Sequence, residues 1–155
     1  MKRDTNLQPL SRQHHNALMA VLLLKKGVQK KAEVQVMQDF ILTVWKDELQ
    51  THFEAEEKWL PAATDEPVLK SIHERMLQEH EVIRNYIYQF YTTLTSHQTI
   101  QTFYELLEQH VRFEEREYFP ALEQSLTSDA LASIGQHLIE SDAKSCADFP
   151  VNFWE

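Results

Sequence analysis

The chain has 155 residues, of which 43% are hydrophobic, and it carries a formal net charge of −9 with five prolines, two glycines and one cysteine. An acidic chain repels the phosphates of nucleic acids, and no apolar run is as long as a membrane-spanning helix. The single cysteine cannot form a disulfide within the chain, which suggests a reducing compartment. We therefore expect a cytoplasmic protein with neither a nucleic-acid nor a membrane partner. The scarcity of helix-breaking residues favours a single domain, residues 1–155, built from long helices.

Hydrophobic periodicity predicts four long helices, at about 8–28, 32–63, 66–95 and 98–125. The third is the most regular, since its apolar stripe advances in alternating steps of four and three residues from Leu69 to Leu94. We expect its N-terminus to be capped by Thr64 or Asp65, and that of the fourth helix by Ser96 or Thr99.

The end of the chain is predicted to add a shorter element. Ser128 begins a fifth helix that extends to about residue 142. The apolar tail from Phe149 to Trp154 is expected to dock on the bundle. The predicted fold class is thus all-α: an up-down-up-down four-helix bundle, at about 8–125, with a short fifth C-terminal helix and tail in residues 126–155.

An internal similarity relates the second and fourth helices. Residues 52–62 read HFEAEEKWLPA and residues 110–121 read HVRFEEREYFPA. Both contain His-x-x-x-Glu-Glu followed by an apolar pair and Pro-Ala, but the second copy has one extra residue. The two helical hairpins therefore look like related halves.

Histidine and glutamate occupy positions that the periodicity assigns to the interior. Each long helix carries one such histidine on its apolar stripe: His14, His52, His80 and His110. Glu56 and Glu114 follow two of them by four residues, and such i, i+4 pairs share one helix face. Two helices can therefore each offer an imidazole and a carboxylate to one interior site, and the other two can each offer an imidazole.

A pair of metal ions explains this set of residues. A bare carboxylate in a protein interior is costly, and two divalent cations would compensate two of them. Imidazole and carboxylate suit iron, with manganese or zinc as substitutes, and the absence of cysteine near the site disfavours a structural zinc centre. We expect two iron ions held by His14, His52, Glu56, His80, His110 and Glu114.

Neighbouring residues leave some assignments open. His15 is the alternative to His14, which is preferred because it lies on the stripe of Leu10, Leu18 and Val21. Counting residues from the helix ends places His80, rather than His73, level with the other histidines. His73 and Tyr118 are candidates to hydrogen-bond the ligands from outside.

Several further polar residues are predicted to lie away from the centre. Glu57 and Glu115 are expected to be solvated or paired with Lys58 and Arg116. His97 and His137 are expected at the surface.

These motifs resemble the hemerythrin-like family, the HHE cation-binding domain, over residues 7 to about 124. The similar segments are Leu10 to His15, His52 to Glu57, Glu79-His80, and His110 to Pro120. The oxygen carriers of that family have His-x-x-x-His on the third helix and His-x-x-x-x-Asp on the fourth. Here Met76 stands four before His80 and Glu114 four after His110, so the chain is more similar to the four-His, two-Glu di-iron members.

The resemblance implies that Glu56 and Glu114 bridge two irons that also share an oxo or hydroxo bridge. Each iron would take two histidines and keep one open position for O2, NO or peroxide. The implied function is sensing, storage or iron handling by a metal-binding protein, in preference to a turnover enzyme. Two alternatives stay open: a di-iron enzyme for peroxide or NO reduction or iron–sulfur cluster repair, and a metal-free interaction bundle. A homodimer is compatible with either.

Overall fold

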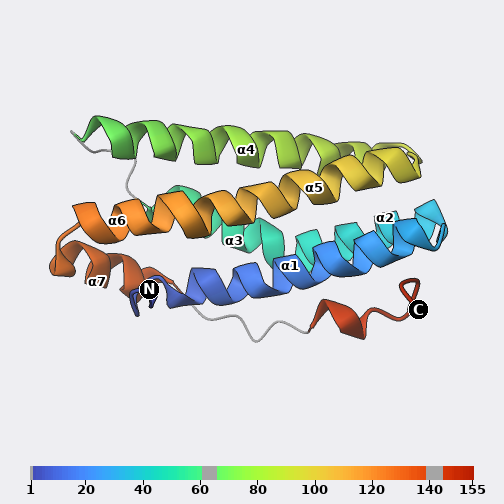
Figure 1. The fold of residues 1–155 in the computed structure, drawn as a ribbon, viewed down its shortest axis with the longest axis horizontal. Coiled ribbons are helices and arrows are strands. Elements are labelled where there is room, and N and C mark those ends of the chain that lie inside the picture. Colours follow the sequence, from blue (N-terminus) through green and yellow to red (C-terminus); the bar gives the residue numbers. More distant parts are fainter. Residues whose placement is uncertain (1, 61–65, 139–144) are drawn as a thin grey trace.

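The computed structural model describes residues 2–60, 66–138 and 145–155, and this part of the chain is helical and contains no strand. Figure 1 shows long helices side by side, with the chain reversing direction after each. The helices are α1 (Gln8–Gln29), α2 (Val34–Val44), α3 (Gln50–Trp59), α4 (Pro67–Thr92), α5 (His97–Phe113), α6 (Phe119–Ser125) and α7 (Ser128–His137). Two π-helical turns, η1 (Trp45–Leu49) and η2 (Glu114–Tyr118), join α2 to α3 and α5 to α6, and a 3-10 turn, η3 (Cys146–Asp148), precedes the tail.

The all-helical prediction is confirmed, whereas several predicted helix ends are wrong. The second helix begins at Val34 and ends at Trp59, because Leu60 has an extended backbone. The third ends at Thr92, because Thr93 is extended, and α7 ends at His137. Residues 61–63 and 139–142, which were also predicted helical, lie outside the described residues.

Side-chain caps fix where two of the long helices begin. The Glu66 carboxylate accepts a hydrogen bond from the Leu69 backbone N–H at 2.7 Å and so caps α4. The predicted caps Thr64 and Asp65 lie outside the described residues. Ser96 caps α5 by accepting from the backbone N–H of Thr99, as the sequence predicted.

The π-turn η2 accounts for the extra residue in the second copy of the internal similarity. In the first copy, Leu60 N–H donates to the carbonyl of Glu56, four residues back. In the second copy, Phe119 N–H donates to the carbonyl of Glu114, five residues back. A π-turn adds one residue to a helix without rotating the segments on either side out of phase. Glu114, the first residue of the turn, and Phe119, directly after the turn, are therefore both buried.

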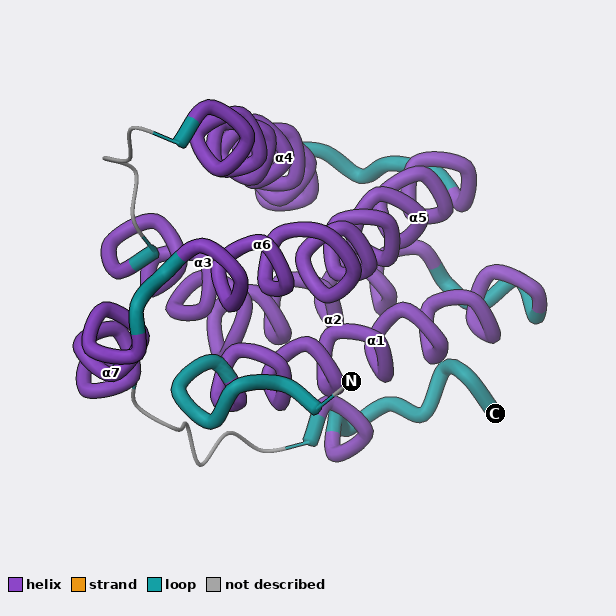
Figure 2. The backbone as a smooth tube through the Cα atoms, turned by 60° about the vertical axis from the view of Figure 1, so that its left-hand side comes forward, coloured by secondary structure: helices purple, strands orange, loops and turns teal. Residues whose placement is uncertain are grey.

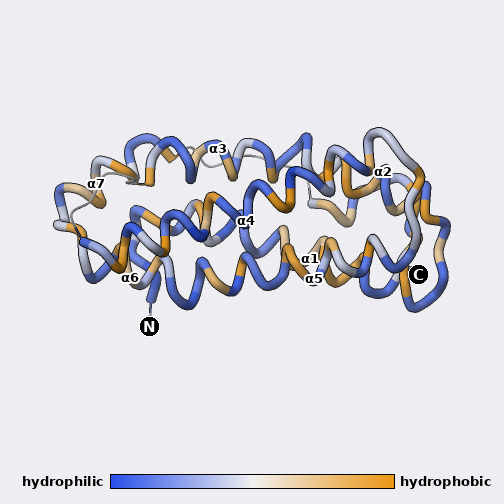
Figure 3. The backbone as a smooth tube through the Cα atoms, turned by 90° about the horizontal axis from the view of Figure 1, so that it is seen from above, coloured by the Kyte–Doolittle hydropathy of each residue, from blue (hydrophilic) through white to orange (hydrophobic). Residues whose placement is uncertain are grey.

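The apolar interior consists of two clusters, and Figure 3 shows apolar and polar residues alternating along the helices that form them. The larger cluster surrounds Phe40 and Phe103, and the smaller one surrounds Met76 and Phe119. Along α1 the smaller cluster ends at Leu10 and the larger begins at Ala17; along α4 the corresponding residues are Met76 and Ile83. Between them lies a layer of buried His and Glu side chains, which holds the candidate site.

The C-terminal tail packs on the outside of the larger cluster, as predicted, and Figure 2 shows it beside α1. Phe153 is 8% exposed and its ring meets that of Phe40 with centroids 5.0 Å apart. Gly27 lies directly beneath it, since a Cβ there would come within 2.6 Å of Phe153 Cδ1. None of the described helices combines the length and apolarity needed to cross a bilayer.

Candidate metal centre

Six of the sequence-predicted residues meet in the polar layer between the two apolar clusters. Their potential ligand atoms form two groups, in each of which all atoms lie within 4.8 Å of one another. One group is His14, His52, Glu56 and Glu114; the other is Glu56, His80, His110 and Glu114. All six side chains are buried, and both glutamates are completely inaccessible to solvent.

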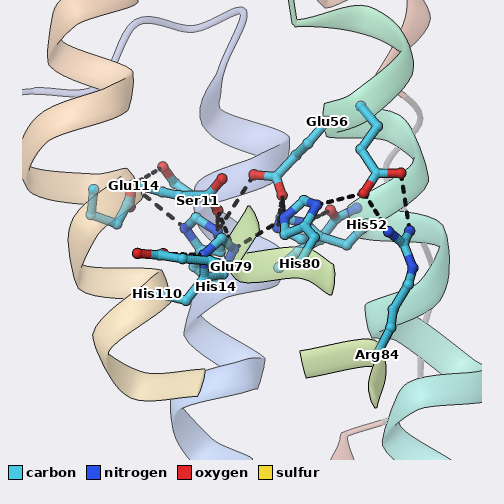
Figure 4. Close-up of polar contacts among 12 residues, drawn as sticks. Ser11, His14, His52, Glu56, Glu79, His80, Arg84, His110 and Glu114 are labelled. Atoms are coloured by element: carbon cyan, nitrogen blue, oxygen red, sulfur yellow. Dashed lines mark hydrogen bonds and ion pairs between the residues drawn. The ribbon is translucent and has the colours of Figure 1, made fainter. Parts of the chain in front are cut away.

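Figure 4 shows the His and Glu side chains of the two groups gathered in one place, and each of the four histidines has its Nε2 atom close to a glutamate oxygen. His14 Nε2 is 2.9 Å from Glu114 Oε1, and His110 Nε2 is 3.3 Å from the same oxygen. His52 Nε2 and His80 Nε2 lie 3.3 and 3.1 Å from Glu56 Oε1. Each carboxylate therefore faces histidines from both pairs, which are His14 with His52 and His80 with His110.

The outer nitrogen, Nδ1, of three histidines makes a hydrogen bond to a side chain around the centre. His80 Nδ1 is 2.7 Å from Glu57 Oε2, and His110 Nδ1 is 2.8 Å from Glu79 Oε1. His52 Nδ1 is 2.5 Å from the amide oxygen of Gln13. Such contacts set the ring orientation and leave Nε2 free to bind a metal.

Arginines hold two of these carboxylates in place. Arg84 donates two hydrogen bonds to Glu57, of 2.6 and 3.0 Å, and Arg75 Nε donates one of 2.9 Å to Glu79. The Glu57 and Glu79 carboxylates are thus positioned by α4 residues on the outer surface of the bundle.

Aromatic rings close the sides of the centre. The His80 ring stacks on Phe53 with centroids 3.8 Å apart, and His14 stacks on Phe119 at 5.3 Å. Trp45 meets Phe53 edge-on behind this wall. Apolar rings on the histidine faces limit water access and lower the local polarity, which strengthens charge interactions at the centre.

Protons are distributed unevenly among the buried groups. Burial and the nearby Glu114 carboxylate raise the pKa of Glu56 well above its usual range. Burial also acts to raise the pKa of Glu114, but His110 and His14 outweigh it and hold that pKa well below its usual range. Burial acts to lower the pKa of His110, but Glu114 and then Glu79 raise it to about 9. Since metal ligands bind in deprotonated form, a cation would take the place of these protons.

Unpartnered polar atoms show that the donor set fits metal ions. His52 Nε2, both oxygens of Glu56 and Glu114 Oε2 are buried and have no hydrogen-bond partner among the described residues. Each such atom costs on the order of 1–3 kcal/mol when left unsatisfied. Cations between the histidine pairs would satisfy all four, and imidazole with carboxylate is a donor set that iron, manganese and zinc accept.

The structure places the histidines of two open alternatives in different surroundings. His15 is exposed, whereas His14 is buried in the cluster. His73 is also buried but lies outside both groups and pairs with the Tyr118 hydroxyl. Burial, followed by the charges of Glu56 and Glu114, raises the pKa of Tyr118, so the hydroxyl that hydrogen-bonds His73 Nδ1 keeps its proton.

Other sequence expectations were wrong about partners. Glu57 contacts His80 and Arg84, and Glu115 contacts Ser11 and Arg3 rather than Arg116. Consecutive residues on a helix point in different directions, which disfavours the expected pairing with the next residue.

The two histidines expected at the surface differ from each other. His97 is half-buried and hydrogen-bonds the Ala32 carbonyl, whereas His137 is exposed and stacks on Trp59.

Four residues near the histidines of the centre were missed: Gln13, Glu57 and Glu79 hydrogen-bond a histidine Nδ1, and the Glu115 carboxylate lies 3.7 Å from His14 Nδ1. A signal for them is present in the sequence, since each is adjacent to a candidate ligand: Gln13 and Glu79 precede a histidine, and Glu57 and Glu115 follow a glutamate. Which helix each one reaches depends on the packing of the bundle.

Comparison with family models matches residues 6–122 to a family described as the hemerythrin HHE cation binding domain. The matched range includes all six His and Glu residues of the candidate metal centre. Comparison with curated proteins and with solved structures found no match.

Proposed function

Since this chain belongs to the hemerythrin family of HHE cation-binding domains, we propose that it is a non-haem di-iron protein that binds O2, NO or peroxide. Its role would be sensing, storage or iron handling. In this proposal the four histidines and two glutamates of the cluster are the protein ligands, on an up-down-up-down bundle. Two iron ions would lie between the histidine pairs, with Glu56 and Glu114 contributing to both.

The observation that carries the proposal is the sharing of two carboxylates by two groups of potential ligands. Glu56 and Glu114 belong to both groups, and three of their four oxygens have no hydrogen-bond partner among the described residues. A single metal ion would need only one of the groups. Two buried carboxylates and two pairs of histidines provide enough ligands, and enough negative charge, for two cations.

The surroundings favour a small ligand. A pair of iron ions supplies reversible redox chemistry and positions for a diatomic or peroxide ligand. The protein supplies the rest: Phe53 and Phe119 cover histidine faces, and a cavity of about 380 Å³ reaches His110 from the surface between α4 and α5. Such a cavity admits small molecules, while the aromatic rings limit the access of water to the centre.

The test is metal content and spectroscopy of the protein purified from its host. We expect about two irons per chain and, in air, absorption bands of a ferric centre with a bridging oxygen ligand, following the metal chemistry of carboxylate and imidazole donors. Addition of NO to the reduced protein should change the spectrum. A protein that binds no metal would refute the proposal.

Variants connect this result to the residues. Glu56→Ala and Glu114→Ala should lose iron, whereas His15→Ala, next to His14 but exposed, should keep it. A Glu114→Ala variant with full iron content would contradict the assignment. Rapid steady-state consumption of peroxide or NO would show an enzyme instead of a sensor, store or iron-handling protein.

A further inference from the structure

The two halves of the centre are built alike, which makes their differences informative. The residue before a ligand histidine reaches across to the outer nitrogen of a histidine on the following helix. Glu79, before His80, contacts His110 Nδ1 at 2.8 Å; Gln13, before His14, contacts His52 Nδ1 at 2.5 Å. One half thus supports its histidine with a carboxylate and the other half with a neutral amide.

A second pair of equivalent contacts differs in the same direction. Glu57, which follows Glu56, contacts His80 Nδ1 at 2.7 Å. Glu115, which follows Glu114, lies 3.7 Å from His14 Nδ1, too far for a hydrogen bond. His14 Nδ1 accordingly has no hydrogen-bond partner among the described residues. Glu115 is instead engaged by Ser11, whose hydroxyl donates to it at 2.9 Å.

The two histidine pairs therefore have unequal support. Both His80 and His110 have a carboxylate hydrogen-bonded to Nδ1, whereas neither His14 nor His52 does. A carboxylate on the outer nitrogen makes the imidazole a stronger donor and fixes its orientation, and losing one such contact typically costs 10–100-fold in metal affinity.

The two halves of the centre are similar in their neighbouring arginines and in their access to solvent, so these features do not offset the difference in hydrogen bonds to Nδ1. Each of the three outer carboxylates has an arginine nearby: Arg84 at Glu57, Arg75 at Glu79 and Arg3 at Glu115. Cavities reach both halves, one of about 230 Å³ lined by Gln13 and one of about 380 Å³ lined by Glu79. The outer partners of the histidines are therefore what distinguishes the two positions.

We propose that the two metal positions differ in affinity: the position at His80 and His110 fills first and holds its ion, and the position at His14 and His52 exchanges its ion. Gln13 is the positioning residue that sets the weaker affinity. This inference rests on the proposed function in one respect, that the centre takes up two ions. It adds that a form with one metal ion per chain is populated during loading and release.

The experiment is calorimetric titration of the metal-stripped full chain with Fe(II) under anaerobic conditions, repeated with Co(II). We expect two binding steps whose affinities differ by about 10–100-fold. Gln13→Glu should tighten the weaker step and bring the two together. Glu79→Gln should weaken the tighter step by a similar factor. Thr51→Glu adds a carboxylate to the exposed rim of the Gln13 cavity and serves as the matched control that leaves both steps unchanged.

Two further variants assign the steps to positions. His52→Ala should keep the tight step and lose the weak one, whereas His110→Ala should lose the tight step. Circular dichroism verifies that each stripped variant is helical. The double variant Gln13→Glu with Glu79→Gln conserves charge and gives each position one carboxylate on a histidine Nδ1, so the two affinities should become nearly equal.

The outcomes separate the inference from the function on which it rests. Two ions bound with equal affinity, or two steps that Gln13→Glu and Glu79→Gln leave unchanged, would overturn the inference while leaving a two-metal centre. Failure to bind a second ion under any condition would overturn the two-metal centre itself.

Discussion

Replacing Glu56 with glutamine should change the stability of the stripped and the metal-loaded protein in opposite directions. Glu56 is fully buried, neither of its oxygens has a hydrogen-bond partner among the described residues, and burial together with Glu114 raises its pKa. Without metal, folding must therefore either bury its charge or take up a proton. Glutamine has the same shape and no charge, and its amide can donate to His52 Nε2, which also has no hydrogen-bond partner.

The expected size follows from the cost of such a group. An unsatisfied buried polar group costs about 1–3 kcal/mol, so stripped Glu56→Gln should be more stable than the stripped parent by about that amount. For a chain of this length each kcal/mol shifts Tm by roughly 2–4 °C. With metal at a thousand times its Kd, the parent gains about 4 kcal/mol per ion bound, and the variant, which lacks a shared carboxylate, loses most of this gain.

The assay is urea unfolding followed by circular dichroism, with chelator and with excess metal. The order of stability should reverse between the two conditions. Glu54→Gln, an exposed change on the same helix, is the matched control and should shift unfolding by less than about 0.5 kcal/mol in either condition. A stripped Glu56→Gln protein that is less stable than the Glu54→Gln control would refute the view that Glu56 is uncompensated without metal.

Three other predictions concern the surroundings of the centre. Gly27→Ala should displace Phe153 and cost about 1–3 kcal/mol in urea unfolding, and less than that in a Phe153→Ala background; equal costs would contradict the contact. Deleting exposed Arg116 from η2 should shorten the second copy to the length of the first and leave the circular dichroism of a helical protein. Deleting Glu108 from α5 should unfold the protein, because the residues after it rotate out of phase; equal tolerance of the two deletions would contradict the assignment of the extra residue to η2. Burial, followed by the charge of Glu48, raises the pKa of Cys146 to about 11. At pH 8 the thiol should therefore be alkylated about 100-fold more slowly in the folded protein than in the urea-unfolded chain. Equal alkylation rates would contradict the burial of Cys146.

The helical pattern carried most of the information about the interior. Because His14, His52, His80 and His110 lie on apolar stripes of separate helices, the sequence predicted that they face the core, and they do. The stripe depends only on the 3.6-residue period, which is a local property of each helix.

What the sequence left undetermined depends on contacts between helices. The contact of Gln13 with His52, or of Glu57 with His80, requires the axial level and rotation of neighbouring helices, which a single helical period does not specify. The extra residue in the segment HVRFEEREYFPA was visible, but its accommodation as a π-turn rather than a shift of phase follows from burial on both sides of the turn.

The polar layer between the two apolar clusters has a consequence for how the molecule moves. Each cluster holds the helices together at one end of the bundle, and among the described residues the layer between them consists mainly of buried His and Glu side chains. Metal ions bound to ligands from all four long helices would hold the helices together at this polar layer. Their release would let the layer fluctuate while the two apolar clusters stay packed. Amide-hydrogen exchange at the middle of the bundle should therefore slow when metal binds and speed up when it is released.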